Sequence, residues 1–306
     1  MVQKRQLGTS DLQVSELGLG CMSLGTDPLK AESIIKHAVE AGINFFDSAD
    51  LYDYGENENI LGQTLKPIRD KVVISTKVGN RWNEGKEGWC WDPSKAYIKE
   101  AVKNSLKRLD TDYIDLYQLH GGTIEDPIEE TIDAFEELKA EGYIRYYGIS
   151  SIRPNVIREY IEKSNIVSVM MQYSLLDRRP EEEALPLLNK HGISVITRGS
   201  LAKGLLSVNM SDRASFAIRE KGYLDYSFSE VSNVVDKLTA SLQRPLNEIA
   251  LHYNLAHPAV ASVVVGASSV QQLKQNVQAV NSEKLTTEDV TQLQALTKNN
   301  IYREHR

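Results

Sequence analysis

The 306-residue sequence has only two cysteines, Cys21 and Cys90, which are too few for a disulfide framework. Its apolar runs are all shorter than the roughly 20 residues of a membrane-spanning helix, and residues 1–5 lack the apolar core of a signal peptide. The formal net charge is −7, so the chain lacks the basic field that nucleic-acid or anionic-membrane binding needs. These absences predict a cytoplasmic globular protein with neither a nucleic-acid nor a membrane partner.

The sequence does contain a repeated unit, in which a short apolar run precedes a longer helical pattern. Eight such runs lie at residues 16–20, 43–46, 72–76, 113–119, 146–149, 167–171, 193–196 and 260–265. Their nearly continuous apolar character is typical of buried parallel strands. Eight alternating units predict an α/β protein with a single (β/α)8 TIM-type barrel, and an open doubly wound sheet is the alternative.

Start and stop signals place helices between the runs. Residues 30–41 have helical periodicity and end at a glycine. The pairs Asp92-Pro93 and Asp126-Pro127 each predict an aspartate N-cap followed by proline at the first helical position. Residues 181–190 form a further predicted helix, and Arg178-Arg179 before it are interpreted as part of a solvated helix start.

Three segments fall outside the repeat. An N-terminal hairpin over residues 4–14 is predicted to cap the bottom of the barrel, and residues 286–297 are predicted to form an extra C-terminal helix. The connection between the seventh and eighth strands, about 199–258, exceeds a normal loop and predicts a functional loop with helical material at 231–256. We therefore predict one domain over 1–306.

Polar side chains stand where several predicted strands end. Asp47, Lys77, His120 and Gln172 each follow an apolar run, and Tyr52 comes shortly after the second one. In a barrel, the carboxyl ends of the strands meet at one mouth, so these side chains are expected to converge there.

This set of side chains has a specific chemistry. A free tyrosine has a pKa of about 10, which is too high for an efficient proton donor near neutrality. An ammonium about 4 Å away stabilises the phenolate by roughly 4 kcal/mol at an effective dielectric near 20. Lys77 can supply that charge, Asp47 can keep Lys77 protonated, and His120 can donate to a carbonyl oxygen. The residues thus indicate that Tyr52 is a general acid aimed at a carbonyl group.

A carbonyl acid with no nucleophile, metal-ligand spacing or Walker loop beside it needs a hydride source, which implies a nicotinamide cofactor. The segment 18–23 (GLGCMS) lacks the third glycine of a Rossmann fingerprint. It is better interpreted as a glycine-rich first strand whose backbone can approach a ligand, with Cys21 and Met22 at its end. Trp82, after the third strand, is predicted to line the substrate pocket with Tyr52 and His120.

Four motifs carry a family resemblance: FFDSADLY at 45–52, GENENILG at 55–62, STK at 75–77 and DLYQLH at 115–120. With the segments around them, from the N-terminal hairpin to about residue 280, they resemble the aldo-keto reductase superfamily, and look closest to the branch of bacterial reductases and potassium-channel β subunits. The resemblance implies a barrel that binds NADPH/NADP+ without a Rossmann domain. It also implies a catalytic tetrad of Asp47, Tyr52, Lys77 and His120, in which the tyrosine protonates an aldehyde or ketone.

The resemblance implies cofactor contacts as well. At three of them this sequence departs from the family pattern: Ser151 replaces an asparagine at the carboxamide, Arg198 replaces a stacking aromatic, and Ser268 replaces a basic residue near the 2′-phosphate. The preference for NADPH over NADH is therefore open. The expected cofactor-binding residues are Gly20, Cys21, Met22, Asp47, Ser150, Ser151, Gln172, Arg198, Gly199, Ser200, Leu201, Lys203, Arg213, Gly266, Ser268, Gln272, Gln275 and Asn276.

Three functions fit these observations. The first is NADPH-dependent reduction of a small-molecule aldehyde or ketone. The second is a nucleotide-sensing regulatory subunit with slow turnover, and the third is a phosphate-handling barrel enzyme that binds no nicotinamide. The intact tetrad favours the reductase, while the physiological substrate and the oligomeric state are not determined by the sequence.

Overall fold

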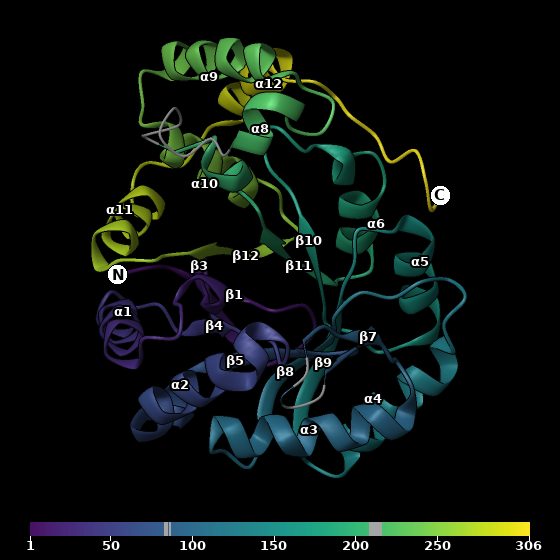
Figure 1. Cartoon of the computed structure of the whole chain (residues 1–306). Helices are drawn as coiled ribbons and strands as arrows, with labels where there is room; N and C mark the ends of the chain where they lie inside the picture. Colours follow the sequence, from purple (N-terminus) through teal and green to yellow (C-terminus); the bar gives the residue numbers. More distant parts are fainter. Residues whose placement is uncertain (83–84, 86, 208–215) are drawn as a thin grey trace.

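A computed structural model describes the chain except for residues 83, 84, 86 and 208–215. Eight parallel strands close into a barrel in the order β10-β11-β12-β3-β4-β5-β8-β9 (Figure 1). The barrel strands are β3 (Leu17–Gly20), β4 (Phe45–Asp47), β5 (Val73–Val78), β8 (Ile114–Leu119), β9 (Ile144–Ser150), β10 (Ser168–Gln172), β11 (Ser194–Arg198) and β12 (Val260–Gly266). Each predicted apolar run forms one strand, and the pairing of β9 with β10 and of β12 with β3 closes the sheet. The predicted (β/α)8 barrel is confirmed, and the open sheet is excluded.

Helices surround the strands (Figure 1). The α-helices are α1 (Pro28–Glu40), α2 (Glu56–Leu65), α3 (Lys95–Leu109), α4 (Ile128–Ala140), α5 (Pro154–Lys163), α6 (Ala184–Lys190), α8 (Phe216–Lys221), α9 (Phe228–Leu242), α10 (Leu246–Ala256), α11 (Val270–Val280) and α12 (Thr287–Leu296). Short 3-10 helices are η1 (Cys21–Ser23), η2 (Tyr52–Gly55), η3 (Lys66–Lys71), η4 (Arg179–Glu181) and η5 (Ala202–Gly204). The predicted C-terminal helix is confirmed as α12, and the helical material predicted between the last two strands is confirmed as α9 and α10.

The predicted N-caps of α3 and α4 were wrong by one or two residues, α1 begins two residues before its predicted start, and α6 begins three residues after it. The N-cap of α3 is Ser94, and the N-cap position of α4 is Pro127. Asp92 Oδ1 instead accepts a hydrogen bond from Ser94 N at 3.1 Å, and Asp126 Oδ2 accepts one from Thr123 N at 2.7 Å. Both carboxylates therefore stabilise the turn next to the helix start. Aspartate side chains accept hydrogen bonds from nearby backbone N–H groups in turns as well as at helix N-caps.

The N-terminal hairpin closes the bottom of the barrel as predicted. Its antiparallel strands are β1 (Lys4–Gln6) and β2 (Gln13–Ser15). The side chains that it contributes pack against apolar residues of the strands in one buried cluster, comprising Leu7, Leu12, Val14, Phe45, Val73, Leu116, Val167, Met170, Ile196, Ala261 and Val264. The lower barrel interior is therefore a packed core, and a ligand has to enter from the opposite end.

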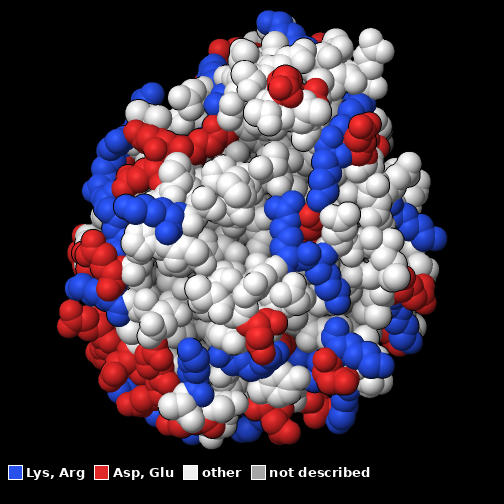
Figure 2. Space-filling view, turned by 180° about the vertical axis from the view of Figure 1, so that it is seen from behind, with Lys and Arg blue, Asp and Glu red and all other residues white. Residues whose placement is uncertain are grey.

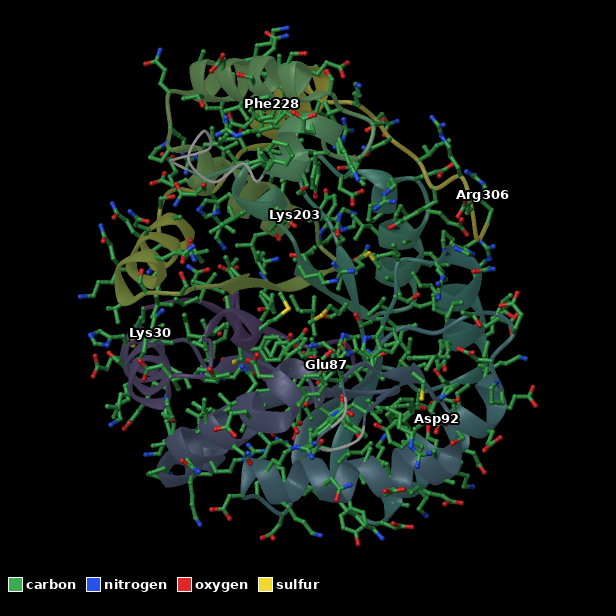
Figure 3. The ribbon with its side chains drawn as sticks, in the orientation of Figure 1. Lys30, Glu87, Asp92, Lys203, Phe228 and Arg306 are labelled. Atoms are coloured by element: carbon green, nitrogen blue, oxygen red, sulfur yellow. The ribbon has the colours of Figure 1, made fainter. Side chains whose placement is uncertain are left out.

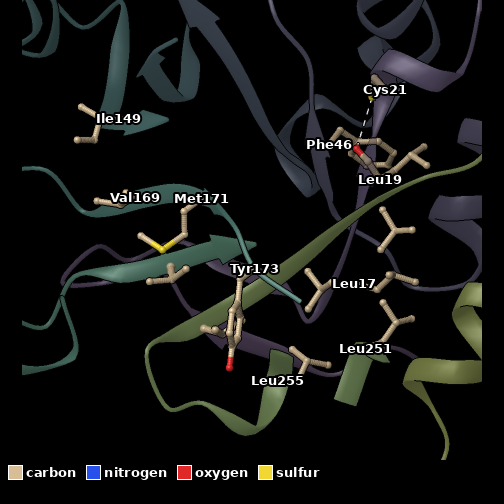
Figure 4. Close-up of a cluster of buried hydrophobic side chains, with 14 of the residues drawn as sticks. Leu17, Leu19, Cys21, Phe46, Ile149, Val169, Met171, Tyr173, Leu251 and Leu255 are labelled. Carbon is tan, nitrogen blue, oxygen red and sulfur yellow. Dashed lines mark hydrogen bonds between the residues drawn. The ribbon is translucent and has the colours of Figure 1, made fainter. Parts of the chain in front are cut away.

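A second apolar layer lies between the strands and the helices. Figure 4 shows Leu17, Val169 and Met171 from the strands, together with Leu251 and Leu255 of α10, in this layer. Each such side chain contributes roughly 1.5–3 kcal/mol when fully removed from water. The two packed layers hold the strand ends, and with them the polar side chains at the mouth, in fixed positions.

On one face of the molecule, a row of basic side chains runs down beside the uncharged centre (Figure 2). On the face shown in Figure 2, acidic and basic residues are interspersed around a largely uncharged centre. Within the part of the chain that the structure describes, none of the helices has the length and apolar character needed to cross a membrane.

Candidate active site

The four tetrad residues come together at the open mouth of the barrel. Asp47 is the last residue of β4, Lys77 lies near the end of β5, and His120 directly follows β8. Since β4, β5 and β8 are neighbours in the barrel, their ends are adjacent. Tyr52 begins η2, a few residues after β4, and all four residues line one cavity of about 1610 Å³.

Lys77 connects two of these residues. Its Nζ donates to Asp47 Oδ2 at 2.7 Å and lies 3.5 Å from the Oη of Tyr52. Only 1% of the Lys77 side chain and 5% of the Asp47 side chain are exposed. Burial by itself would lower the pKa of Lys77, but the interactions with Asp47 and Tyr52 together outweigh it and raise that pKa above the usual range. Lys77 is therefore a permanent ammonium beside the tyrosine hydroxyl.

The ion pair is itself held by neighbouring groups. Asp47 Oδ1 accepts from Ser75 Oγ at 3.2 Å, and Gln118 Nε2 donates to Ser75 Oγ at 2.7 Å. Lys77 Nζ also donates to the backbone carbonyl of Ser48 at 2.6 Å. These hydrogen bonds replace contacts with water that the two buried charges have lost, which lowers the free-energy cost of burying the ion pair. They also hold the ion pair in one preferred geometry.

The sequence motif at 55–62 supports the site from beneath. Asn57 accepts from Ser48 Oγ and donates to the carbonyl of Cys21, both at 2.7 Å. Glu58 is fully buried, accepts from Thr76 Oγ1 at 2.5 Å and pairs with Arg108 Nε at 2.7 Å. Because Ser48 and Thr76 flank Asp47 and Lys77, the two contacts fix the backbone that carries the ion pair.

His120 is a neutral imidazole in this site. Burial, together with the charges of Lys77 and Arg198, lowers the pKa of His120 to about 3. Its ring meets that of Tyr52 edge-to-face, with centroids 5.9 Å apart, and its Nδ1 is buried without a hydrogen-bond partner among the described residues. A proton on Nε2 is then the tautomer that can donate to a ligand in the cavity.

The cavity is suited to an extended ligand. It reaches from the tetrad past β9 and β10 to the start of α11, and the glycines on its wall include Gly20 and Gly266. A Cβ at Gly266 would lie 2.2 Å from Ser23 Oγ, so a larger residue there would force the Ser23 side chain to move. Of the expected cofactor residues, the ones lining the cavity are Gly20, Met22, Asp47, Ser150, Ser151, Gln172, Arg198, Gly199, Ser200, Leu201, Lys203, Gly266, Ser268 and Gln272.

Donors for both ends of a dinucleotide are present, so the residues fit a nicotinamide cofactor. Ser150 and Gln172 offer hydroxyl and amide groups at the ends of β9 and β10. Arg198 Nη1 donates to Gln172 Oε1 at 3.2 Å, which places a guanidinium beside that amide. Lys203 lies inside the ring of helices, whereas Lys30 is on the outer edge (Figure 3). Ser268 comes just before α11, whose amino terminus favours an anion.

Some expected cofactor residues do not line the cavity. The Cys21 side chain is buried and donates to Leu19 O at 3.6 Å instead of lining the cavity (Figure 4). Gln275 and Asn276 lie further along α11, outside the cavity lining. Arg213 lies outside the described residues.

Trp82, the tryptophan predicted to line the substrate pocket, does not line the cavity either. Trp82 stacks edge-to-face on Tyr54 and lies under Arg108, away from the cavity. Trp89 lines the cavity instead. The short hairpin of β6 (Asn80–Arg81) and β7 (Cys90–Trp91) follows β5 and determines which of the two indole rings faces the mouth of the barrel. The conformation of this hairpin cannot be predicted from the spacing of the tryptophans in the sequence.

Sequence reasoning missed the contribution of the C-terminal tail and of two arginines. Residues 299–305, Arg153 and Arg179 all line the cavity. The solvated interpretation of Arg178 and Arg179 was wrong, because Arg178 is buried against Glu181 while Arg179 pairs with the buried Asp177. No periodicity or motif in the sequence indicates that the tail lines the cavity. For Arg178 and Arg179, the acidic residues next to them in the sequence were the one signal that could have predicted ion pairs.

Comparison with known proteins agrees with this geometry. The Aldo/keto reductase family matches residues 16–298. The "Uncharacterized oxidoreductase YqkF" of Bacillus subtilis (strain 168) is 60% identical over 308 residues, with 100% of both chains covered. The "NADH-specific methylglyoxal reductase" of Escherichia coli (strain K12) is 32% identical over 306 residues, covering 92% of this chain and 94% of that protein. The holo form of aldo-keto reductase AKR11C1 from Bacillus halodurans is 60% identical, with a TM-score of 0.95 and 100% of both chains covered.

A closed (β/α)8 barrel with Asp47, Lys77 and His120 at adjacent strand ends and Tyr52 beside them defines an oxidoreductase of the nicotinamide-dependent barrel type. The chain belongs to the aldo/keto reductase family.

Proposed function

We propose that this protein reduces aldehydes or ketones to alcohols with NADPH, and that Tyr52 is the general acid. The observation that carries the proposal is the position of Lys77, whose buried ammonium bridges Asp47 and the hydroxyl of Tyr52. A cation at that place favours the phenolate that remains after proton donation.

Each tetrad residue has one task in this mechanism. A bound nicotinamide supplies the hydride. Tyr52 Oη protonates the carbonyl oxygen, Lys77 stabilises the resulting phenolate, and Asp47 keeps Lys77 charged and in place. His120, as the neutral tautomer with a proton on Nε2, donates to the same carbonyl oxygen and orients it.

We propose NADPH as the reductant. Ser150 and Gln172 would hold the carboxamide, Lys203 and the adjacent backbone would meet the phosphates, and Ser268 at the start of α11 would meet the adenosine end. The amino terminus of α11 supports binding of an additional phosphate there. One relative named above is NADH-specific, so the comparison of NADPH with NADH belongs in the first assay.

The test is NADPH oxidation with a panel of aldehydes and ketones, for the wild type, Tyr52→Phe and Tyr54→Phe. Tyr54 is 48% exposed and does not line the cavity, which makes it a matched control. We expect Tyr52→Phe to lose turnover while its NADPH affinity is unchanged, and Tyr54→Phe to retain turnover. Equal turnover of Tyr52→Phe and the wild type would refute the mechanism. Tight NADPH binding without reduction of any carbonyl would favour the sensing subunit.

A further inference from the structure

The cavity has a charge opposite to that of the chain. The whole sequence carries −7, yet among the described residues six cationic side chains line the cavity against three anionic ones. The cationic side chains are those of Lys77, Arg153, Arg179, Arg198, Lys203 and Arg303; the anionic ones are those of Asp47, Asp225 and Glu304. A basic cavity in an acidic protein concentrates anions at that cavity.

Four of the six cations are accounted for: two have an acidic partner, and the other two, Arg198 and Lys203, are expected cofactor-binding residues. Lys77 is paired with Asp47, and Arg179 contacts both carboxyl oxygens of Asp177, at 2.7 and 2.8 Å. Arg198 donates to Gln172, and Lys203 lies in the segment proposed to meet the cofactor phosphates. These four leave Arg153 and Arg303 to be explained.

Neither of the remaining arginines is neutralised within the described part of the chain. Arg153 donates through Nη1 to the carbonyl of Gly122, an uncharged acceptor, and forms no ion pair there. The Arg303 side chain is exposed and has neither a hydrogen bond nor an ion pair with any described residue. Both guanidinium groups are therefore available to an anion in the cavity.

Their location is on the reacting side of the cavity. Arg153 follows β9, and β9 lies between β8 and β10 in the barrel. His120 directly follows β8, and Gln172 is the last residue of β10. The tail that carries Arg303 is held on both sides of it. Asn300 Oδ1 accepts from Arg178 N at 2.7 Å, and the carbonyl of His305 accepts from Asn155 N at 2.9 Å. This course of the tail keeps Arg303 beside the ends of β9 and β10. The adenosine end of the cofactor is expected at α11, which follows β12, and β12 is three strands away from β9 in the barrel.

We propose that Arg153 and Arg303 form a subsite for a carboxylate on the substrate, so that the protein acts on aldehydes or ketones that also carry a carboxylate. This inference rests on the proposed reductase function. The carbonyl carbon gains the hydride, the carbonyl oxygen gains the proton of Tyr52, and the carboxylate passes through unchanged as the group that orients the substrate.

The experiment uses 4-carboxybenzaldehyde and its methyl ester, which differ in the charge at one end. Both are measured at saturating NADPH with the wild type, Arg303→Gln, Arg153→Gln and the control Arg306→Gln. Arg306 belongs to the same tail but pairs with Glu182 and does not line the cavity. We expect the two cavity variants to raise KM for the acid about tenfold or more, the range of a charged hydrogen bond. KM for the ester and KM for NADPH are expected to stay unchanged.

The outcomes separate the two proposals. If neither aldehyde is reduced by the wild type, the proposed function fails. If both are reduced but Arg303→Gln and Arg153→Gln change KM equally for acid and ester, the carboxylate subsite is wrong. A rise in KM for NADPH would show that the arginines bind the cofactor instead, which also overturns the subsite. Added salt is expected to raise KM for the acid alone.

Discussion

The Lys77 ammonium lies 2.7 Å from Asp47 Oδ2 in a position almost wholly removed from solvent. A buried ion pair contributes little net stability, but removing one partner leaves an uncompensated charge in the interior. Stability and chemistry at this site therefore depend on the same contact.

The first prediction is the effect of Asp47→Asn. We expect the unfolding free energy to fall by about 3–5 kcal/mol, because Lys77 loses its counter-ion, and kcat to fall with it. Denaturant unfolding and steady-state kinetics measure the two effects. The control is Asp110→Asn, whose partner Lys66 is 62% exposed, and a loss of no more than about 1 kcal/mol is expected there. Equal losses in the two variants would contradict the buried-charge argument.

The second prediction concerns pH and His120. Its pKa is about 3 in the folded protein and about 6.5 when unfolded, so the unfolded chain takes up a proton first as the pH falls. The stability due to neutral His120 is full above pH 6.5 and is lost progressively toward pH 3. We expect the stability difference between wild type and His120→Asn to shrink by roughly 2 kcal/mol from pH 7.5 to 5. A difference that stays constant would show that His120 titrates normally.

The third prediction concerns Asp50, which is 1% exposed and whose carboxyl oxygens have no ordinary hydrogen-bond partner among the described residues. Burial and the nearby charge of Glu58 raise the pKa of Asp50 well above its usual value. The raised pKa lowers the unfolding free energy only where the unfolded chain has lost the Asp50 proton. This loss of stability is therefore absent near pH 3 and appears as the pH rises above the unfolded pKa of about 3.9. We expect Asp50→Asn to raise Tm at pH 7, with roughly 2–4 °C for each kcal/mol gained.

The gain from Asp50→Asn is expected to disappear on acidification. Melting curves at pH 7 and near pH 4 provide the measurement, and Asp53→Asn, at an exposed position nearby, is the control. A lower Tm at pH 7 for Asp50→Asn would mean that the carboxylate is charged and stabilising in the folded state.

The fourth prediction concerns the contact of α2 with α3. A Cβ at Gly62 would lie 2.4 Å from the backbone carbonyl oxygen of Leu109, so the two helices would have to separate. We expect Gly62→Ala to lower the unfolding free energy by about 1–3 kcal/mol, even though alanine is the better helix former. Gln63→Ala, at an exposed position of the same helix, is expected to be neutral or slightly stabilising. A stabilised Gly62→Ala would show that the helices can adapt.

Much of the barrel could be predicted because its signals are local. Buried parallel strands need continuous apolar runs, and each run was found within a few residues of its strand. The placement of Asp47 and Lys77 followed from the barrel itself, since the ends of neighbouring strands meet. Their side-chain contact needed only this topology and opposite charges.

The remaining features depend on loop conformation. Trp82 and Trp89 are close in sequence, yet the β6–β7 hairpin turns only Trp89 to the cavity. Arg153 and Arg303 are far apart in sequence and meet the same cavity because the tail crosses it. Such positions are set by long-range hydrogen bonds such as that between Asn155 and His305, which leave no periodic pattern in the sequence.

The course of the tail has a practical consequence for anyone producing this protein. Residues 299–305 form part of the cavity wall, so an affinity tag fused after Arg306 would be carried at the substrate entrance. Met1 is 99% exposed and precedes the hairpin at the closed end of the barrel. A tag belongs at that end, where a polyhistidine sequence would leave kinetic measurements undisturbed.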